Sequence, residues 1–140
     1  MFAIYDNNLV DMNRGDSRSF PIFLNKGTML EPIRYVLQEE ADKLVFYLCK
    51  PQESFQEAVL TKEMTSFDLD ENGDAIIKFT PEDTLDLEPG VYFLEVKLYH
   101  TNYDKTEDVQ TVITKKRFTI LRWEVDYDNR KIMWKCYRGC

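Results

Sequence analysis

The sequence predicts an all-β protein, a sandwich of about seven to nine antiparallel strands followed by a C-terminal β-hairpin. Apolar and polar residues alternate with a period of two over much of the chain, as they do in strands with one buried face. Turn signals such as Asn72-Gly73 separate these short segments at regular spacing. Aromatic residues make up 14% of the chain, and aromatic side chains pack well on a pleated sheet.

The size of the chain fits one domain. A chain of 140 residues can bury a hydrophobic core without disulfides or metals. Its three cysteines, Cys49, Cys136 and Cys140, are an odd number, so no disulfide framework is expected. The first residues carry neither a basic region nor a long apolar segment, so we expect no signal peptide and a protein made and kept in a cytoplasm.

Charge and hydropathy bear on the partners of the protein. The formal net charge is −7 and the isoelectric point is about 4.8. An acidic surface repels phosphate backbones, so we expect no nucleic-acid partner. The longest apolar run, Leu44 to Cys49, is too short to cross a bilayer, so no membrane partner is expected either.

The first core strands are expected at 20–24, where Phe20, Ile22 and Leu24 alternate, and at 42–50. Alternating apolar residues end at Leu24, and the Asn-Lys-Gly sequence at 25–27 predicts a turn. Pro21 lacks an N–H group, which indicates an edge strand or a bulge. Residues 42–50 are apolar on both faces and predict a central strand. Residues 33–41 are ambiguous between a short strand and a helical turn.

The middle of the chain predicts a hairpin. Residues 58–62 fit a strand, and residues 65–69 and 75–80 are expected to be strands that flank a turn at Asn72-Gly73. Residues 80–83, Thr-Pro-Glu-Asp, then predict one helical turn with the threonine as N-cap. Leu85 and Leu87 are expected to hold this turn against the core.

The strongest strand pattern follows. Residues 92–98 alternate, with Tyr92, Leu94, Val96 and Leu98 on one face. Two further strands are expected at 109–113 and 117–121, and the polar segment 103–108 predicts a loop.

One local motif narrows the fold. Leu87, Pro89, Gly90 and Tyr92 match the Leu-x-Pro-Gly-x-Tyr pattern of a tyrosine corner, in which the Tyr hydroxyl bonds to nearby backbone at the entry to a late strand. This predicts an immunoglobulin-like β-sandwich and a structural role for Tyr92. The sandwich is expected to span 13–121, with an N-terminal arm or edge strand at 1–12 and a C-terminal hairpin or arm at 122–140.

The C-terminal segment contains both tryptophans. A two-residue turn at Asp128-Asn129 would pair Trp123 with Trp134 and Val125 with Ile132, which gives one apolar face. An isolated hairpin is marginal in water, so this face must be covered by the chain's own sandwich or by a partner. The candidate interface residues are Trp123, Val125, Tyr127, Ile132 and Trp134.

A Ca²⁺ site is one alternative for the turn at 68–74. Asp68, Asp70, Asn72 and Asp74 offer oxygen ligands at alternate positions, as the start of an EF-hand loop does. The twelfth position, where such a loop has a bidentate glutamate, is Phe79. A hairpin turn is therefore favoured, and no metal or cofactor is predicted.

No other motif indicates catalysis or a metal centre. His100 is the single histidine, is expected in a loop, and lies in no recognisable catalytic motif, so no enzymatic activity is predicted. Cys49, Cys136, Cys140 and His100 are too few and too scattered in sequence for a zinc site. The tripeptide Arg14-Gly15-Asp16 is expected to form a turn rather than an adhesion site.

The order of these pieces resembles a family of tailed-phage modules, the amino-terminal domains of upper baseplate proteins and related immunoglobulin-like virion proteins. The resemblance covers about residues 13–121. It is carried by Arg14-Gly15-Asp16-Ser17, by residues 42–48 with Lys50-Pro51, by Asn72-Gly73-Asp74, by residues 79–84, by residues 87–92 and by residues 116–120.

The resemblance implies a non-enzymatic structural or adaptor protein of a phage particle, in the tail, baseplate or connector region. Its partners would be other virion proteins and copies of itself, joined through sheet edges and terminal arms. The chain departs from the family by ending after a short aromatic hairpin. Two alternatives stay open: a stand-alone carbohydrate- or protein-binding sandwich that uses an aromatic patch such as Tyr99 and Tyr103, and a Ca²⁺-responsive module.

Overall fold

The protein is all-β, as predicted. The computed structural model describes residues 2–5, 11–27, 30–122, 124–125 and 134–135, with side chains described for 11–27 and 30–122. The strands are β1 (Phe2–Tyr5), β2 (Asp11–Asn13), β3 (Arg18–Gly27), β4 (Pro32–Arg34), β5 (Asp42–Cys49), β6 (Leu60–Met64), β7 (Ala75–Phe79), β8 (Gly90–Thr101), β9 (Glu107–Leu121), β10 (Glu124–Val125) and β11 (Trp134–Lys135). The short helices are η1 (Phe55–Glu57), η2 (Ser66–Asp68) and α1 (Pro81–Leu85).

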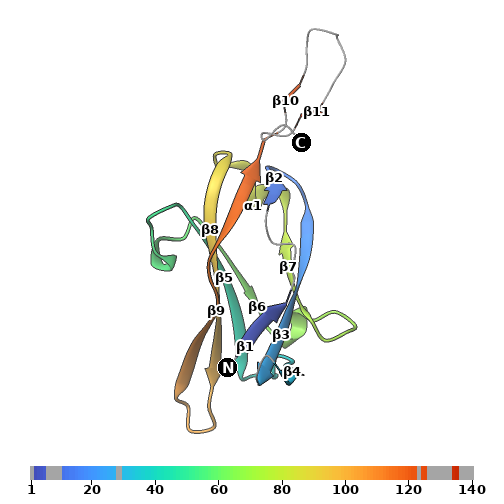
Figure 1. The fold of residues 1–140 in the computed structure, drawn as a ribbon, viewed down its shortest axis with the longest axis vertical. Helices are drawn as coiled ribbons and strands as arrows, with labels where there is room; N and C mark the ends of the chain where they lie inside the picture. The colour runs from blue at the N-terminus through green and yellow to red at the C-terminus, as the bar shows by residue number, and fades with distance from the viewer. Residues whose placement is uncertain (1, 6–10, 28–29, 123, 126–133, 136–140) are drawn as a thin grey trace.

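One sheet has the strand order β2-β9-β8-β5-β6 (Figure 1). β5 pairs with β8 on one side and β6 on the other, so the central position predicted for this strand is confirmed. The prediction of purely antiparallel strands is wrong at one edge, because β2 runs parallel to the end of β9. β1, the strand that precedes β2 in the chain, lies in the other sheet beside β3.

The second sheet is built on β3. β1 and β4 pair with its second half, and β7 pairs with its first half. Pro21 lies in the first half, where β7 is the strand partner among the described residues, which fits an edge-like position. The turn predicted at 25–27 is wrong, because β3 continues to Gly27. Its pairing with β1 and β4 keeps this segment extended.

The core lies between these two sheets. The largest fully buried side chains come from both of them: Phe46, Phe118, Met12, Ile22, Leu44, Leu48, Ile77, Leu94, Leu98, Ile120 and Val96. The alternation predicted for β8 is confirmed, since Tyr92, Leu94, Val96 and Leu98 are all buried. Met12 is 1% exposed, so the predicted boundary at 12/13 leaves a core residue outside the sandwich. β1 and β2 are sheet strands, the second of the two alternatives for residues 1–12.

The last two strands form one long ribbon. The separate strands expected at 109–113 and 117–121 are wrong, because β9 runs unbroken from Glu107 to Leu121. Its register against β8 shifts twice, between Leu94 and Lys97. These bulges take up extra residues of β9, and the φ of Lys115 is +44° beside them.

Of the predictions for the short helices and the segments beside them, some are confirmed and others are wrong. α1 is confirmed, with the Thr80 N–H donating to the Asp83 carboxylate at 2.7 Å. Of the two leucines expected to hold it, Leu87 packs against the core, whereas Leu85 is 56% exposed. The strand predicted at 65–69 is wrong, because Thr65 caps η2 and leaves a single bridge from Leu69 to Ala75. In the ambiguous segment, the strand lies earlier than expected, at β4.

β10 and β11 form an antiparallel C-terminal hairpin, as predicted, but its register differs. Val125 pairs with Trp134 and Glu124 with Lys135, two residues away from the predicted pairs. The predicted register rested on a two-residue turn at Asp128-Asn129. A slide of two residues keeps each side chain on the same face, so the apolar pattern alone does not determine the register.

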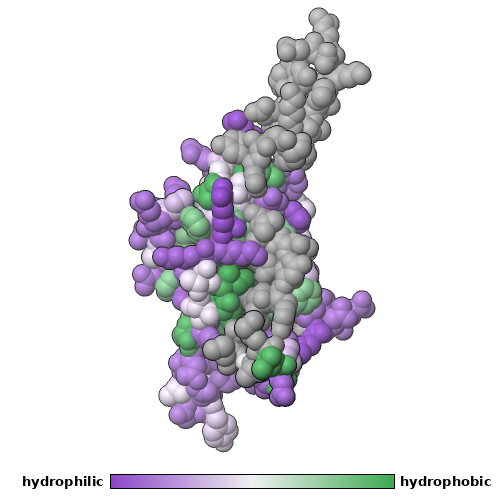
Figure 2. Space-filling view, in the orientation of Figure 1, coloured by the Kyte–Doolittle hydropathy of each residue, from purple (hydrophilic) through white to green (hydrophobic). Residues whose placement is uncertain are grey.

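The visible surface of the described residues is mostly hydrophilic, with apolar residues in small separate areas (Figure 2). Within the described part of the chain, no helix has the length and apolar character needed to cross a membrane.

Candidate functional site

The predicted interface lies largely outside the described side chains. Trp123, Tyr127 and Ile132 are outside the described residues, and Val125 and Trp134 are described as a backbone pair. In Figure 1, β10 and β11 lie beyond the two sheets, next to the end of β9. The hairpin is therefore placed at one end of the molecule, with its two described pairs made within the hairpin itself.

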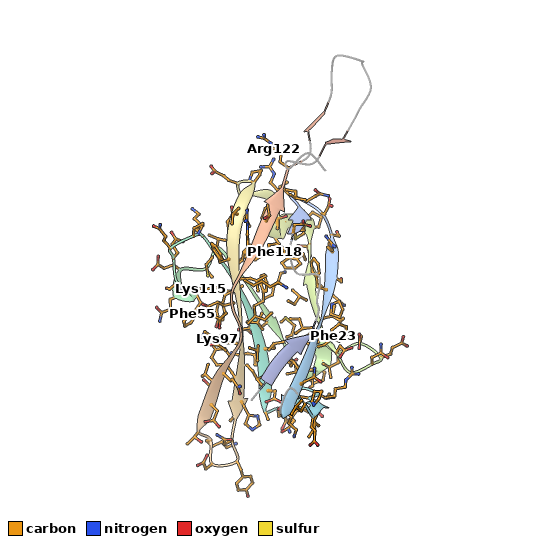
Figure 3. All side chains as sticks on the ribbon, in the orientation of Figure 1. Phe23, Phe55, Lys97, Lys115, Phe118 and Arg122 are labelled. Atoms are coloured by element: carbon orange, nitrogen blue, oxygen red, sulfur yellow. The ribbon has the colours of Figure 1, made fainter. Side chains whose placement is uncertain are left out.

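The outer face of the five-stranded sheet, the face turned away from β3, carries a folded-back loop. Residues 50–59 leave β5 and return to β6, and η1 directs Phe55 onto the sheet. The Phe55 ring lies 5.1 Å from the ring of Tyr47, and the Lys97 ammonium lies 4.5 Å from its centroid. Figure 3 shows Phe55, Lys97 and Lys115 together on this side of β8 and β9.

A pocket of about 290 Å³ lies between this loop and the sheet. We call it the outer pocket, and it is lined by Cys49, Lys50, Gln52, Glu53, Ser54, Phe55, Phe93, Glu95 and Lys115. Cys49, Phe55 and Phe93 give it apolar walls. Its charged residues carry both signs, so it suits a group that is apolar in the centre and polar around it.

Two of the lining residues hold an unfavourable backbone conformation. Gln52 has a φ of +72° and Lys115 a φ of +44°, the left-handed region that favours glycine. Such residues each cost of order 1 kcal/mol or more, and they gather where function constrains the chain. The bulge in β9 is the structural cause at Lys115, since bulges redirect a side chain out of the regular alternation.

The outer pocket is acidic near Cys49. Burial raises the pKa of the Cys49 thiol, and the carboxylates of Glu95, Glu53 and Glu57 raise it further. The thiol is therefore neutral at pH 7 and contributes an apolar surface rather than a nucleophile.

The turn between β8 and β9, unlike the outer pocket, is exposed to solvent. Tyr103 is fully exposed at its tip. Two hydrogen bonds hold the turn. The Asn102 N–H donates to the Thr106 carbonyl at 2.7 Å, and the Thr106 hydroxyl donates to the Asp104 carboxylate at 2.6 Å. The Asn102 amide also donates to Asp108 at 3.0 Å. The tip is thus ordered although it projects into solvent.

Tyr99 and Tyr103, the patch proposed for a sugar-binding alternative, have different surroundings. The Tyr99 hydroxyl lies 2.6 Å from that of Tyr47, and the ammonium of Lys43 lies 5.3 Å from the centroid of the Tyr99 ring. Tyr99 is therefore engaged on the sheet, whereas Tyr103 stands alone at the tip.

A buried carboxylate that the sequence did not reveal lies at the same end of the sheet. Asp42 accepts hydrogen bonds from the Tyr35 hydroxyl and from the Gln38 N–H (2.7 Å), and its other oxygen lies 2.5 Å from His100 Nδ1. The antiparallel register pairs Asp42 with His100, so a correct strand alignment would have found the contact. His100 belongs to β8, not to the predicted loop.

The Asp42–His100 pair orients the imidazole, as a carboxylate does beside a catalytic histidine. A pocket next to it is lined by Lys26, Tyr35, Gln38, Leu98, His100, Asp108 and Gln110. This described lining offers no serine, threonine or cysteine as a nucleophile. The described contacts connect residues 35–42 to the end of β8. That the chain is not an enzyme stays a prediction.

Three of the four candidate Ca²⁺ ligands, the carboxylates of Asp68, Asp70 and Asp74, make other contacts. Asp68 accepts from the Thr65 N–H at 2.9 Å, and Asp70 accepts from the N–H groups of Asn72 (2.8 Å) and Asp74 (2.9 Å). The Asp74 carboxylate is nearly buried and forms a salt bridge with Arg34. These oxygens shape the turn at Gly73, whose φ is +84°.

The tyrosine-corner residues make the expected contact. The Tyr92 hydroxyl donates to the carbonyl of Glu88 at 2.6 Å, and Leu87 packs against the core. Gly90, with a φ of +146°, begins β8 directly after Pro89. The turn predicted at Arg14-Gly15-Asp16 is also present, with the Gly15 N–H donating to the buried hydroxyl of Thr84 at 2.8 Å.

The zinc alternative has two ligands within the described residues, Cys49 and His100. The register pairs Cys49 with Phe93, seven residues along β8 from His100, a separation of roughly 23 Å at about 3.3 Å per residue. Cys136 and Cys140 lie outside the described residues. Among the residues that the structure describes, no group of three or more histidine, cysteine or acidic side chains could hold a metal ion.

Comparisons with known proteins add no relative. A scan of protein-family models found no match to this chain, and a search of curated protein sequences found none either.

Proposed function

We propose that the protein is a non-enzymatic assembly module, a structural or adaptor protein of a phage particle that joins neighbouring subunits through its C-terminal hairpin and its sheet edges. The observation that carries the proposal is that the described side chains, residues 11–27 and 30–122, enclose a hydrophobic core between two sheets. The described core residues run from Met12 to Ile120 and come from both sheets. The proposal assigns the C-terminal hairpin, which Figure 1 places beyond the two sheets, to a contact with a partner.

A strand order that fits an immunoglobulin-like topology supports the proposal. β3, β5, β6, β7, β8 and β9 correspond in order to strands B, C, C′, E, F and G of that fold. β9-β8-β5-β6 gives the order G-F-C-C′, and the β3–β7 pair gives B–E. The Tyr92 hydrogen bond lies at the start of the F-equivalent strand, where such folds have their tyrosine corner.

The edges of the five-stranded sheet contribute unequally to assembly. Strand β6 carries an inward-pointing lysine, Lys62, whose ammonium lies 2.5 Å from the Asp83 carboxylate. An inward charge is a common protection of a sheet edge against a foreign strand. β2 covers only Thr119 to Leu121 of β9. We therefore assign the principal contact to the terminal hairpin rather than to β6.

The resemblance to virion modules implies that copies of the protein are arranged around the axis of a phage particle.

The experiment is to replace Trp123 and Trp134 with serine in the 140-residue chain and to measure molar mass by light scattering across a concentration series. We expect the unmodified chain to form oligomers and the double variant to have a lower molar mass at the same concentrations, because aromatic anchors dominate protein interfaces.

Phe67→Ser, at an exposed aromatic residue elsewhere on the chain (84% exposed), is the matched control and should leave the mass unchanged. An unmodified chain that stays monomeric, or a double variant with the same oligomers, would contradict the proposal. Glycan screening would then test the stand-alone binding alternative.

A further inference from the structure

We propose that the tip of the β8–β9 turn of one copy, with Tyr103 at its centre, docks into the outer pocket of a second copy. The inference rests on the proposed assembly function and names a contact within it that does not involve the C-terminal hairpin.

The tip is built as an anchor. Tyr103 is fully exposed, and a large aromatic side chain in this position leaves its apolar area in water. The turn that presents it is fixed by Asn102, Asp104 and Thr106, and Lys105 holds a φ of +73° within it. A preorganised anchor loses little conformational entropy when it binds.

The outer pocket is built as a receptor. Cys49, Phe55 and Phe93 offer it an apolar interior of about 290 Å³, room for one aromatic side chain and part of its neighbours. At its border, Lys50, Glu53, Glu95 and Lys115 form no salt bridge among the described residues, so two cations and two anions face the opening without a partner there. Unpaired charges of both signs around an apolar centre call for a ligand of matching pattern.

The tip has that pattern. Tyr103-Asp104-Lys105 places an anion and a cation directly after the aromatic ring. Hydrogen bonds from the side chain and the backbone of Thr106 lower the pKa of Asp104, so its carboxylate stays charged through the neutral range. Asp104 complements Lys50 and Lys115, and Lys105 complements Glu53 and Glu95.

Phe67 and Leu30 are exposed to a similar degree, but neither has this arrangement. Phe67 is followed by Asp68, whose carboxylate caps η2, and Leu30 is followed by an acid and a proline. The charge pattern thus favours the β8–β9 tip over Phe67 and Leu30.

The contact must be between copies. Phe93 and Tyr103 are ten residues apart along one extended ribbon, and even the stretch from Glu95 to Thr101 within β8 spans roughly 20 Å at about 3.3 Å per residue. The tip of a molecule therefore cannot reach its own pocket. A contact between two different surfaces can repeat from copy to copy, which gives rings or filaments.

The test uses the 140-residue chain with Trp123→Ser and Trp134→Ser, so that the terminal hairpin does not contribute. Molar mass is measured by light scattering across a concentration series. Two defective forms are made in this background: Tyr103→Ala, which lacks the anchor, and Lys50→Glu with Lys115→Glu, which reverses the cations of the pocket. Phe67→Ala is the matched control. Glu53→Lys is a second variant of the pocket, which reverses one of its anions. Thermal melts verify that each form is folded.

We expect the mass of the parent and of Phe67→Ala to rise with concentration, and both defective forms to stay monomeric. An equal mixture of the two defective forms should give dimers and nothing larger, because one intact anchor meets one intact pocket. A parent that stays monomeric, a Tyr103→Ala form that still associates, or a mixture without dimers would overturn the inference. The proposed function fails separately, if the tryptophan substitutions leave the mass of the unmodified chain unchanged.

Discussion

Single residues decide where this chain departs from a simple alternating pattern. Asp42 is the clearest case, a carboxylate whose side chain is 0% exposed and whose two oxygens meet the Tyr35 hydroxyl, the Gln38 N–H and His100. A buried carboxylate is stable only when its oxygens are satisfied. This one residue therefore fastens the segment before β5 to the end of β8.

Asp42→Ala should lower the free energy of unfolding by about 3 kcal/mol, because it leaves buried donors without an acceptor. Urea unfolding at pH 7 measures the change. Asp16→Ala, at an exposed aspartate, is the control and should stay within about 0.5 kcal/mol of the unmodified chain. Equal losses in the two variants would show that the Asp42 contacts do not stabilise the fold.

The sequence could reveal such residues only in part. The Leu-x-Pro-Gly-x-Tyr spacing identified Tyr92, because the motif is local and its hydrogen bond reaches back only to Glu88. The Asp42–His100 contact joins residues 58 apart, so it depends on the strand register. Likewise, the sequence does not distinguish the charged residues of the outer pocket from ordinary surface charges, because they come together only when the loop packs against the sheet.

At the scale of elements, capping explains both a success and a failure. The Thr80 to Asp83 cap predicted α1 correctly. The same chemistry at Thr65 and Asp68 starts η2 where alternation had predicted a strand, because local side-chain bonds to the backbone compete with strand pairing. The bulges of β9 could not be predicted, since the apolar pattern tolerates an inserted residue.

The cap of α1 should show in the pH dependence of stability. Burial of the Asp83 carboxyl raises its pKa, but the hydrogen bond and charge of Lys62 and the hydrogen bonds from Thr80 lower it more, to below its ordinary value. A carboxyl whose pKa is lowered by folding stabilises the protein above its unfolded pKa, about 3.9. That contribution is lost as the pH falls through the folded pKa.

Asp83→Ala should therefore cost about 1 kcal/mol at pH 7, typical of a lost cap, and should lose less stability than the unmodified chain when the pH falls below about 4. Thermal melts at a series of pH values measure both effects. Glu82→Ala, at the exposed neighbouring position, is the control. Parallel acid profiles for the unmodified chain and Asp83→Ala would contradict this account of the cap.

For the whole molecule, composition and alternation were enough to predict an all-β fold with β5 as an interior strand of its sheet. They could not predict which distant strands pair within a sheet, because pairing such as β2 with β9 is set by packing between distant segments. The described core nevertheless closes between Met12 and Ile120. The proposed function assigns the residues beyond Leu121 to contacts with other molecules.

The most direct test compares the 140-residue chain with a chain that ends at residue 121, by molar mass in solution and by thermal melting. We predict that the shorter chain melts within a few degrees of the longer one and is smaller in mass at every concentration where the longer one is oligomeric. This result would show a self-sufficient sandwich whose C-terminal hairpin serves assembly. A shorter chain that is unfolded, or that forms the same oligomers, would contradict the account.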